Sequence, residues 1–329
     1  MERFTRANLK LNYNHHHVQI FTFTLWATGM QLGAKGAKNK WEEALVKEDK
    51  LAPFVDLSSR PSAPETISQP VAAVVQQPIM LQVVEKICAK LTRDGMVESF
   101  EIKGSLTLTA NNEDVSKCAV VMAVGNVSLF TFVTHPKINK PLYDKSGVLQ
   151  LKEAAKGFPV SRPLGILRWS YSSSADDLVP LKINCWPEEE SRGQMNVSIE
   201  YSMDQDKLEL VDVQIRIPFG TSDSPNILNA DGRYKHNAQA QELVWELDLI
   251  DSSNSSGTLE FNVSQRNADA FFPITAQFAS KKLFCNIDVT GVKAVEGGGP
   301  LQYGISKGLS TEEYTIELAL VGPCVGGHE

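Results

Sequence analysis

The chain has 329 residues, of which 42% are hydrophobic, and a formal net charge of −7 at pH 7. This length allows two or three domains, and the apolar content supports a folded core, which excludes a wholly disordered chain. The acidic balance argues against nucleic acid as a partner.

The N-terminal quarter of the chain lacks the pattern of a folded domain. Residues 1–28 match no pattern and are predicted to be disordered. Residues 29–50 are predicted to contain a short helix, because Asn39 followed by Glu42 resembles a helix N-cap with its reciprocal acid. Residues 51–78 contain prolines spaced by serines, which predicts an extended, disordered linker.

Beyond the linker, apolar and polar residues alternate with a period of two. In Val211–Ile217 every odd-numbered residue is β-branched and every even-numbered residue is polar. Alternation of this kind buries one set of side chains and leaves the other in water. Many such stretches in succession predict an all-β protein of antiparallel sandwich sheets. The stretches are Phe100–Leu108, Val197–Tyr201, Val211–Ile217, Leu243–Leu249, Leu259–Val263, Cys285–Val289 and Tyr314–Leu320.

Turn signals divide this region. Asp94–Gly95, Asp231–Gly232 and Ser256–Gly257 are each predicted to form a tight hairpin. Residues 149–156 (LQLKEAAK) are predicted to form a short helix between strands. A β region of about 240 residues is large for one sandwich and fits two joined subdomains. The tail, residues 321–329, has no pattern and is predicted to be disordered.

Residues that could carry out catalysis or hold a metal are scarce. His135 and His236 are the only histidines between residues 79 and 320, and neither lies in a nucleophile motif. The five cysteines form no Cys-x-x-Cys pair, and unpaired cysteines favour a reducing, cytoplasmic compartment. The run Glu188–Glu190 is predicted to be a solvated turn. We therefore expect no enzyme, no catalytic residue, no metal site and no cofactor.

Aromatic residues in the β region indicate binding or core packing. Trp169, Trp186 and Trp245 all lie in predicted strands. Trp245 shares one face with two leucines and is expected to be core, whereas Trp186, which precedes a proline at a strand end, is expected to be partly exposed.

A basic and aromatic neighbourhood occurs near residue 283. Lys281 and Lys282 precede Leu283 and Phe284, and this combination suits an acidic peptide that carries aromatic residues. Lysines that protect an edge strand from further pairing explain the same pattern equally well.

Several segments of the chain match one known family and occur in the family's order. They are GMQLGAKG (29–36), VESFEIKGSLTLT (97–109), THPKINKPLYDKSGVLQLK (134–152), FPVSRPLGILRW (158–169), PLKINCWP (180–187), DGRYKHN (231–237), DAFFPITAQFASKKLFCNIDV (269–289) and EEYTIE (312–317). On these segments, residues 81–320 resemble the mu homology domain, and specifically that of the delta subunits of coatomer.

The resemblance implies an elongated mu homology domain, residues 79–320, built from two β-sandwich subdomains. Subdomain A would comprise residues 79–187 and 271–320, and subdomain B residues 188–270. It also implies a subunit of the COPI vesicle coat, cytoplasmic and peripheral on Golgi membranes and COPI-coated vesicles, in Golgi-to-ER retrograde and intra-Golgi transport. The partners implied are other coatomer subunits, an Arf GTPase and its GTPase-activating protein, and ER tethering factors with tryptophan motifs.

For a site that binds tryptophan motifs, we select aromatic and basic side chains that lie in or beside the predicted strands. Trp186 and Phe284 are predicted to form aromatic walls, and Lys182 and Lys282 to contact acids that flank the motif.

The sequence departs from its apparent relatives in two respects. Members of the delta family begin with a longin domain, whereas residues 1–28 match no part of one. The sequence therefore leaves open whether this chain assembles into coatomer. Adaptor mu subunits hold tyrosine motifs with a tryptophan near their last strands, and residues 301–311 contain none.

Two other functions stay open. One is an adaptor-type mu subunit that recognises tyrosine-based cargo signals. The other is a secreted β-sandwich enzyme or lectin, for which the Asn-x-Ser sequons at Asn126, Asn196, Asn254 and Asn262 would be glycosylation sites.

Overall fold

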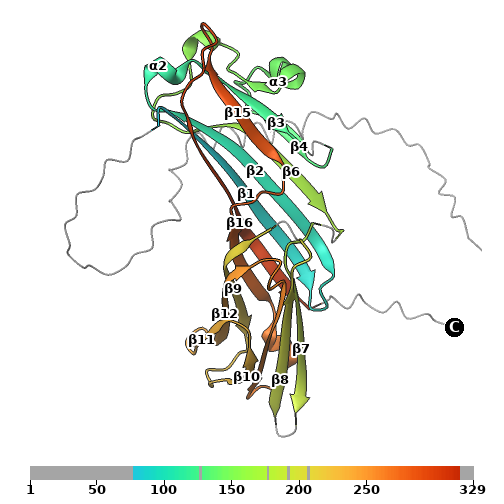
Figure 1. Ribbon diagram of the computed structural model, residues 1–329. Coiled ribbons are helices and arrows are strands. Elements are labelled where there is room, and N and C mark those ends of the chain that lie inside the picture. The colour runs from blue at the N-terminus through green and yellow to red at the C-terminus, as the bar shows by residue number, and fades with distance from the viewer. Residues whose placement is uncertain (1–76, 126–127, 176–177, 191–192, 206–207, 319–329) are drawn as a thin grey trace, which may run out of the picture. The chain divides into compact units, whose positions relative to one another are not determined.

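Over the residues that it describes, a computed structural model gives three β-sheets with few helices (Figure 1). The all-β class expected from the alternating pattern is confirmed. The predictions for residues 1–28, 29–50 and 321–329 lie outside the described residues, as does the linker up to residue 76. The structure describes residues 77–125, 128–175, 178–190, 193–205 and 208–318.

The largest sheet has nine strands and joins segments that are far apart in the sequence. Its order is β11 (Arg233–Asn237), β12 (Glu242–Ile250), β9 (Leu210–Pro218), β14 (Ile274–Ser280), β16 (Gly304–Glu317), β1 (Ile79–Thr92), β2 (Val97–Ala110), β6 (Leu164–Ser173) and β4 (Thr131–Thr134). β1 and β16 run parallel, with Met80 opposite Gly304 and Thr92 opposite Glu317. The expectation of purely antiparallel sheets is wrong at this pair, because no hairpin joins these two strands and fixes their direction.

Two smaller sheets complete the architecture. The four-stranded sheet has the order β10 (Asn226–Ala230), β13 (Ser256–Val263), β8 (Gln194–Ser202) and β7 (Lys182–Glu190). The three-stranded sheet has the order β15 (Ile287–Ala294), β3 (Cys118–Val124) and β5 (Val148–Leu149).

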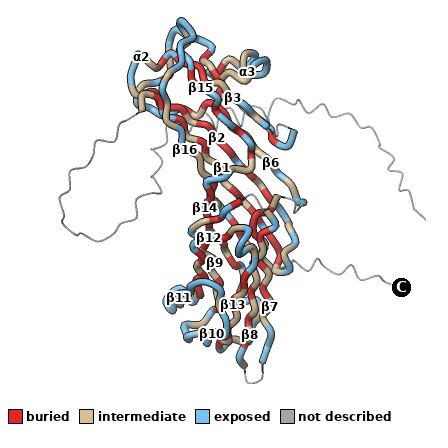
Figure 2. The backbone as a smooth tube through the Cα atoms, in the orientation of Figure 1, coloured by how far each residue is buried: buried red, intermediate tan, exposed pale blue. Residues whose placement is uncertain are grey.

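Both smaller sheets pack against the nine-stranded sheet. The rings of Tyr201 on β8 and Trp245 on β12 lie 5.4 Å apart between centroids. Lys307 on β16 donates from Nζ to the carbonyl of Ile287 and the carboxylate of Asp288, at the start of β15. Buried residues therefore alternate with exposed ones along the strands, as Figure 2 shows. The prediction that Trp245 belongs to the core is confirmed, since it is fully buried.

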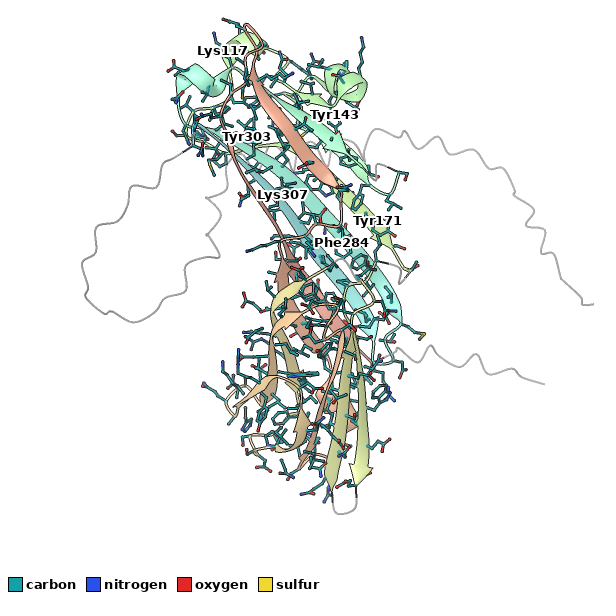
Figure 3. The ribbon with its side chains drawn as sticks, in the orientation of Figure 1. Lys117, Tyr143, Tyr171, Phe284, Tyr303 and Lys307 are labelled. Atoms are coloured by element: carbon teal, nitrogen blue, oxygen red, sulfur yellow. The ribbon has the colours of Figure 1, made fainter. Side chains whose placement is uncertain are left out.

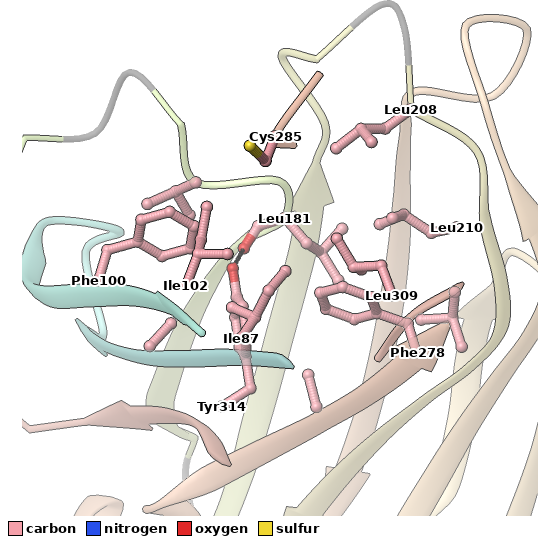
Figure 4. Close-up of a cluster of buried hydrophobic side chains, with 14 of the residues drawn as sticks. Ile87, Phe100, Ile102, Leu181, Leu208, Leu210, Phe278, Cys285, Leu309 and Tyr314 are labelled. Atoms are coloured by element: carbon pink, nitrogen blue, oxygen red, sulfur yellow. Dashed lines mark hydrogen bonds between the residues drawn. The ribbon is translucent and has the colours of Figure 1, made fainter. Parts of the chain in front are cut away.

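Part of the core joins β1, β2 and the segment before β7. Figure 4 shows Phe100 near Leu181, with Tyr314 donating its hydroxyl to the carbonyl of Leu181. Burial raises the pKa of Tyr314 well above its usual range, so this hydroxyl stays protonated and remains a donor. This hydrogen bond fixes the start of β7 to the centre of the large sheet.

The helices differ from the prediction. Residues 149–156 hold the end of β5 and one 3-10 turn, η1 (Ala154–Lys156), so most of the predicted helix is wrong. The α-helix of this region is α3 (Lys140–Ser146), which begins after an Asn139 cap and ends at a left-handed Gly147. The described residues also form two further short elements, α2 (Glu113–Ser116) and η2 (Ala268–Phe271).

One of the three hairpin predictions is confirmed. Asp94–Gly95 connects the paired strands β1 and β2, with Gly95 at a φ of 79°. Asp231–Gly232 forms a turn, but it leads from β10 in one sheet to β11 in another and is not a hairpin. Ser256–Gly257 lies inside β13, where a Cβ on Gly257 would stand 2.6 Å from the Tyr201 ring. This glycine makes room for a ring and forms no turn.

Every predicted strand overlaps an observed one, but only Val211–Ile217 and Leu243–Leu249 agree with their strands, β9 and β12, within one residue. β2, β8 and β13 each begin three residues before the predicted start, and β16 begins ten residues before Tyr314. Two further differences concern β7 and β15. Glu188–Glu190 are exposed as expected, but they extend β7 and form no turn. β15 starts at Ile287, two residues after the predicted Cys285. The division into subdomains stays a prediction, since β7 crosses residue 187 and the nine-stranded sheet takes strands from both sides.

Candidate functional site

A carboxylate lies on the buried face of β1. The side chains on this face are apolar before and after it, yet Glu85 is fully buried. Its Oε1 accepts hydrogen bonds from Trp169 Nε1 at 2.8 Å and from the Cys285 amide at 3.0 Å, and its Oε2 accepts one from the Phe284 amide at 2.7 Å. Glu85 therefore holds the 281–286 segment against β1 and β6.

Burial has the largest influence on the pKa of Glu85. Desolvation raises the pKa of Glu85 above its ordinary value, and the three hydrogen bonds lower the pKa by less. The segment that carries Phe284 is thus held in place by a buried carboxyl group, which accepts a hydrogen bond from each of the three donors named above.

A glycine makes space for the indole that contacts Glu85. Gly104 on β2 pairs with Glu85 on one side and with Trp169 on the other. A Cβ at residue 104 would stand 1.9 Å from Cε2 and 2.0 Å from Nε1 of Trp169. Only glycine lets the indole lie flat over β2 and reach the carboxylate.

Four rings form a cluster beside this anchor, which we name the aromatic surface: Phe100, Phe130, Tyr171 and Phe284. Phe100 contacts Phe284 edge-on with centroids 6.1 Å apart and contacts Tyr171 at 6.5 Å. Tyr171 lies 5.8 Å from Phe130. Phe284 and Tyr171 are half-buried, and Figure 3 shows them close together. Phe284 and Tyr171 both contact the fully buried Phe100, which holds these two half-buried rings in place beside the core.

The two predicted lysines have acidic partners on one connection. Lys182 Nζ lies 2.9 Å from Asp204 Oδ2, and Lys282 Nζ lies 2.7 Å from Glu209 Oε1. Both acids belong to the connection between β8 and β9. Such partly exposed ion pairs are weak, and both ammonium groups can exchange these partners for acids of a ligand.

Trp186 occupies a different position. It lies on β7, an edge strand, opposite Ser198, and its 37% exposure confirms the prediction of partial exposure. Pro187 follows it on the same edge, where a residue without an amide hydrogen is tolerated. The structure brings Phe284 together with Phe100. Lys182 and Trp186 lie on one face of β7, four residues apart along the strand.

The sequence analysis missed Glu85, Gly104 and Tyr171. A signal for Glu85 exists, because it interrupts the apolar row that runs from Ile79 to Ala89 at every second residue. The role of Tyr171 has no such signal, since it depends on the pairing of β6 with β2.

Other groups offer little chemistry. Burial raises the pKa values of the Cys118, Cys185 and Cys285 thiols to about 12, which leaves them protonated and poorly nucleophilic. In the described part of the chain, no group of three or more His, Cys, Asp or Glu residues could hold a metal ion. Over the same residues no helix has the length and apolar character to cross a bilayer.

Comparison with known proteins gives a consistent result. A family model described as the adaptor complexes medium subunit family matches residues 67–318. The probable coatomer subunit delta of Caenorhabditis elegans is 33% identical over 244 residues, which cover 74% of this chain and 47% of that protein. Coatomer subunit delta of Dictyostelium discoideum is 34% identical over 301 residues, which cover 88% of this chain and 53% of that protein. The chain thus spans about half the length of these curated relatives.

Among solved structures, the yeast delta-COP-I mu-homology domain matches with a TM-score of 0.64 and 26% sequence identity. The match covers 73% of this chain and 98% of the yeast domain. The same yeast domain in complex with a Dsl1 WxWxV peptide matches equally well.

Proposed function

Because the chain belongs to the adaptor complexes medium subunit family, we propose that it is a delta-type, non-enzymatic subunit of the COPI vesicle coat whose mu homology domain binds tryptophan-based linear motifs. The observation that carries this proposal is the match to nearly the whole yeast delta-COP-I domain, a domain solved with a WxWxV peptide. The delta subunits of coatomer among its relatives support the coat assignment.

The proposal includes the setting of a coat subunit. The partners are other coatomer subunits, an Arf GTPase with its GTPase-activating protein, and ER tethering factors that carry tryptophan motifs. The site of action is the cytoplasmic surface of Golgi membranes and COPI-coated vesicles, in Golgi-to-ER and intra-Golgi transport.

We place the motif on the aromatic surface. An indole needs flat apolar walls and little rearrangement of the protein, because ordering an unstructured peptide already costs free energy. Phe284 and Tyr171 supply such walls, and the hydrogen bonds from the 281–286 segment to Glu85 fix one of them in advance. Lys282 lies within this segment, and it can exchange its exposed ion pair with Glu209 for acids that flank the motif.

Alanine substitution tests this placement. Phe284→Ala and Tyr171→Ala are each expected to weaken binding of an acid-flanked Trp-x-Trp peptide about thirtyfold, since a central aromatic anchor contributes on the order of 2 kcal/mol. Calorimetric titration measures the change, with thermal melting of each variant as the check on folding.

Trp186→Ala is the matched aromatic control. We expect it to bind the peptide as the unmodified chain does. If Trp186→Ala or Lys182→Ala abolishes binding while Phe284→Ala does not, the motif lies along β7 and the aromatic surface is the wrong site.

The adaptor-type function remains the second candidate, because the matching family model describes adaptor medium subunits in general. It predicts binding of a tyrosine-based peptide, although residues 301–311 offer no tryptophan to hold the tyrosine. The secreted alternative has less support. Asn196, one of its sequons, donates its amide to Asn262 at 2.7 Å within the four-stranded sheet, and the four described cysteines are free thiols.

A further inference from the structure

Negative charge is concentrated in one segment of the chain. Residues 188–270 contain sixteen carboxylates and six cationic side chains, a net charge of −10 in a chain whose net charge is −7. This segment supplies β8, β10 and β13 of the four-stranded sheet, and β7 enters it with Glu188–Glu190. A partner of this region is therefore expected to be cationic, because like charges that face each other across an interface repel.

The outer face of the four-stranded sheet is polar and holds one large aromatic side chain (Figure 1). Alternate residues of β7, β8 and β13 are buried, and the residues between them form the outer face. On these three strands the outer face consists of Asn, Gln, Ser, Thr and Glu, together with Lys182 and Trp186. Ser198 lies opposite Trp186 and is too small to cover the indole, which is 37% exposed.

Three carboxylates surround this indole. Glu188 follows Trp186 on the same face of β7, and Glu200 is its diagonal neighbour on β8. Glu260 on β13 lies opposite Ser198, one strand further away. Neighbouring strands are about 4.8 Å apart, so that all three residues start within about 10 Å of Trp186. We name these four residues the acidic face: Trp186, Glu188, Glu200 and Glu260.

The carboxylates of the acidic face differ from those on the outer side of β12. There, each carboxylate has a cationic partner within 3.0 Å. The pairs are Glu242 with Arg216, Glu246 with Lys235 and Asp248 with Arg233. Within the described residues, no carboxylate of the acidic face forms an ion pair, and Glu260 accepts one hydrogen bond, from Asn196 Nδ2 at 3.3 Å.

Cationic groups do lie at the two ends of the sheet. Lys182 pairs with Asp204 at 2.9 Å, and the Arg266 guanidinium lies beside Gly193, next to the end of β7. The negative charge that is not neutralised is therefore centred on Trp186, between these ends.

We propose that the acidic face binds a basic segment of a protein partner. A lysine or arginine side chain stacks on Trp186, and neighbouring cationic groups of the segment pair with the three carboxylates. Indole is the aromatic ring that attracts cations most strongly. An extended segment presents every second side chain to one side, as the strands of the acidic face do, so that several cations can be bound together.

A metal ion does not suit this arrangement. Hard cations need several oxygens at about 2.5 Å from one point, whereas these carboxylates start from three different strands. In the described part of the chain no group of carboxylates has the required geometry. Separate charges around an aromatic ring instead fit a ligand that carries several cations along its length.

Fluorescence anisotropy with the 329-residue chain tests the acidic face. The probe is a labelled eight-residue peptide of alternating lysine and serine, and its reference has glutamate in place of lysine. We expect binding of the lysine peptide alone. The triple variant Glu188→Gln, Glu200→Gln, Glu260→Gln should weaken binding about thirtyfold at low salt, because three partly exposed ion pairs are lost.

The indole is tested separately from the charges. Trp186→Ala should weaken binding of the lysine peptide about fivefold, and Trp186→Phe should retain most of the affinity, because phenylalanine also presents an aromatic face. Thermal melting of each variant checks the fold. An unchanged affinity of Trp186→Ala would overturn the proposal, since binding would then depend on charge alone.

A second triple variant controls for net charge. Glu113→Gln, Asp114→Asn and Glu296→Gln remove the same charge from exposed residues outside the four-stranded sheet, and this variant should bind the lysine peptide as the unmodified chain does. Equal losses in the two triple variants would overturn the proposal. So would an unmodified chain that binds neither peptide, or one that binds both equally.

This proposal and the motif-binding proposal fail independently. The lysine peptide contains no aromatic residue, so Phe284→Ala should bind it as the unmodified chain does. Conversely, the triple glutamate variant should bind the Trp-x-Trp peptide normally, because the aromatic surface is untouched. A chain that binds the lysine peptide through the acidic face but ignores the Trp-x-Trp peptide would remove the motif proposal and leave this one standing.

Discussion

Replacing Glu85 by alanine is expected to destabilise the fold by about 3–5 kcal/mol. The substitution leaves the Trp169 indole and the amides of Phe284 and Cys285 without their acceptor, and each unsatisfied buried donor costs about 1–3 kcal/mol. Urea unfolding followed by tryptophan fluorescence measures the loss. A loss below about 1 kcal/mol would show that water replaces the carboxylate and that the 281–286 segment is anchored by other contacts.

Glu85→Gln separates the charge of this group from its shape. The pKa of Glu85 is raised in the folded state, so above the ordinary pKa of a glutamate the folded chain binds more protons than the unfolded chain. The contribution of Glu85 is therefore largest below that ordinary pKa and is lost as the pH rises through the folded pKa. Glutamine cannot titrate. Between the ordinary pKa of a glutamate and the raised pKa of folded Glu85, the free energy of unfolding of the unmodified chain should therefore fall relative to that of Glu85→Gln.

Gly104→Ala is expected to destabilise the fold by about 3 kcal/mol. Its Cβ would lie 1.9 Å from the Trp169 indole, which is nearly fully buried and bound to Glu85. Overpacking of a core costs about 1–3 kcal/mol, and displacing the indole also breaks its hydrogen bond. Thermal and urea unfolding measure the effect.

Gly165→Ala is the matched control. This glycine lies on β6, opposite Thr107 of β2, and a Cβ there meets no atom within 4 Å. Alanine at residue 165 should leave the stability unchanged or raise it slightly, because glycine weakens a strand. Equal losses at residues 104 and 165 would show that strand flexibility, and not the indole, explains the glycine at residue 104.

The period-two pattern predicted the strands, because each strand buries one face. The partial exposure of Trp186 was predicted separately, from the proline that follows it at an expected strand end. The pattern could not predict which strands pair. β1 lies beside β16 across more than two hundred residues of sequence, and only this arrangement and the pairing of β2 with β6 bring Phe284, Phe100 and Tyr171 together.

The errors have local causes. Gly257 was mistaken for a turn residue, although its role is to accommodate the Tyr201 ring. In 149–156, good helix formers predicted a helix, but pairing of β5 with β3 overrides that propensity at its first residue. The short α3 was missed because its caps, Asn139 and Gly147, enclose too few residues for a periodic pattern.

The most direct test of the motif-binding function is calorimetric titration of this chain with two peptides. One carries an acid-flanked Trp-x-Trp motif and the other a tyrosine-based signal. We expect micromolar binding of the first peptide alone, lost when its tryptophans are replaced by alanine. Binding of the tyrosine peptide alone, or of neither peptide, would contradict the proposal that this mu homology domain captures tryptophan motifs.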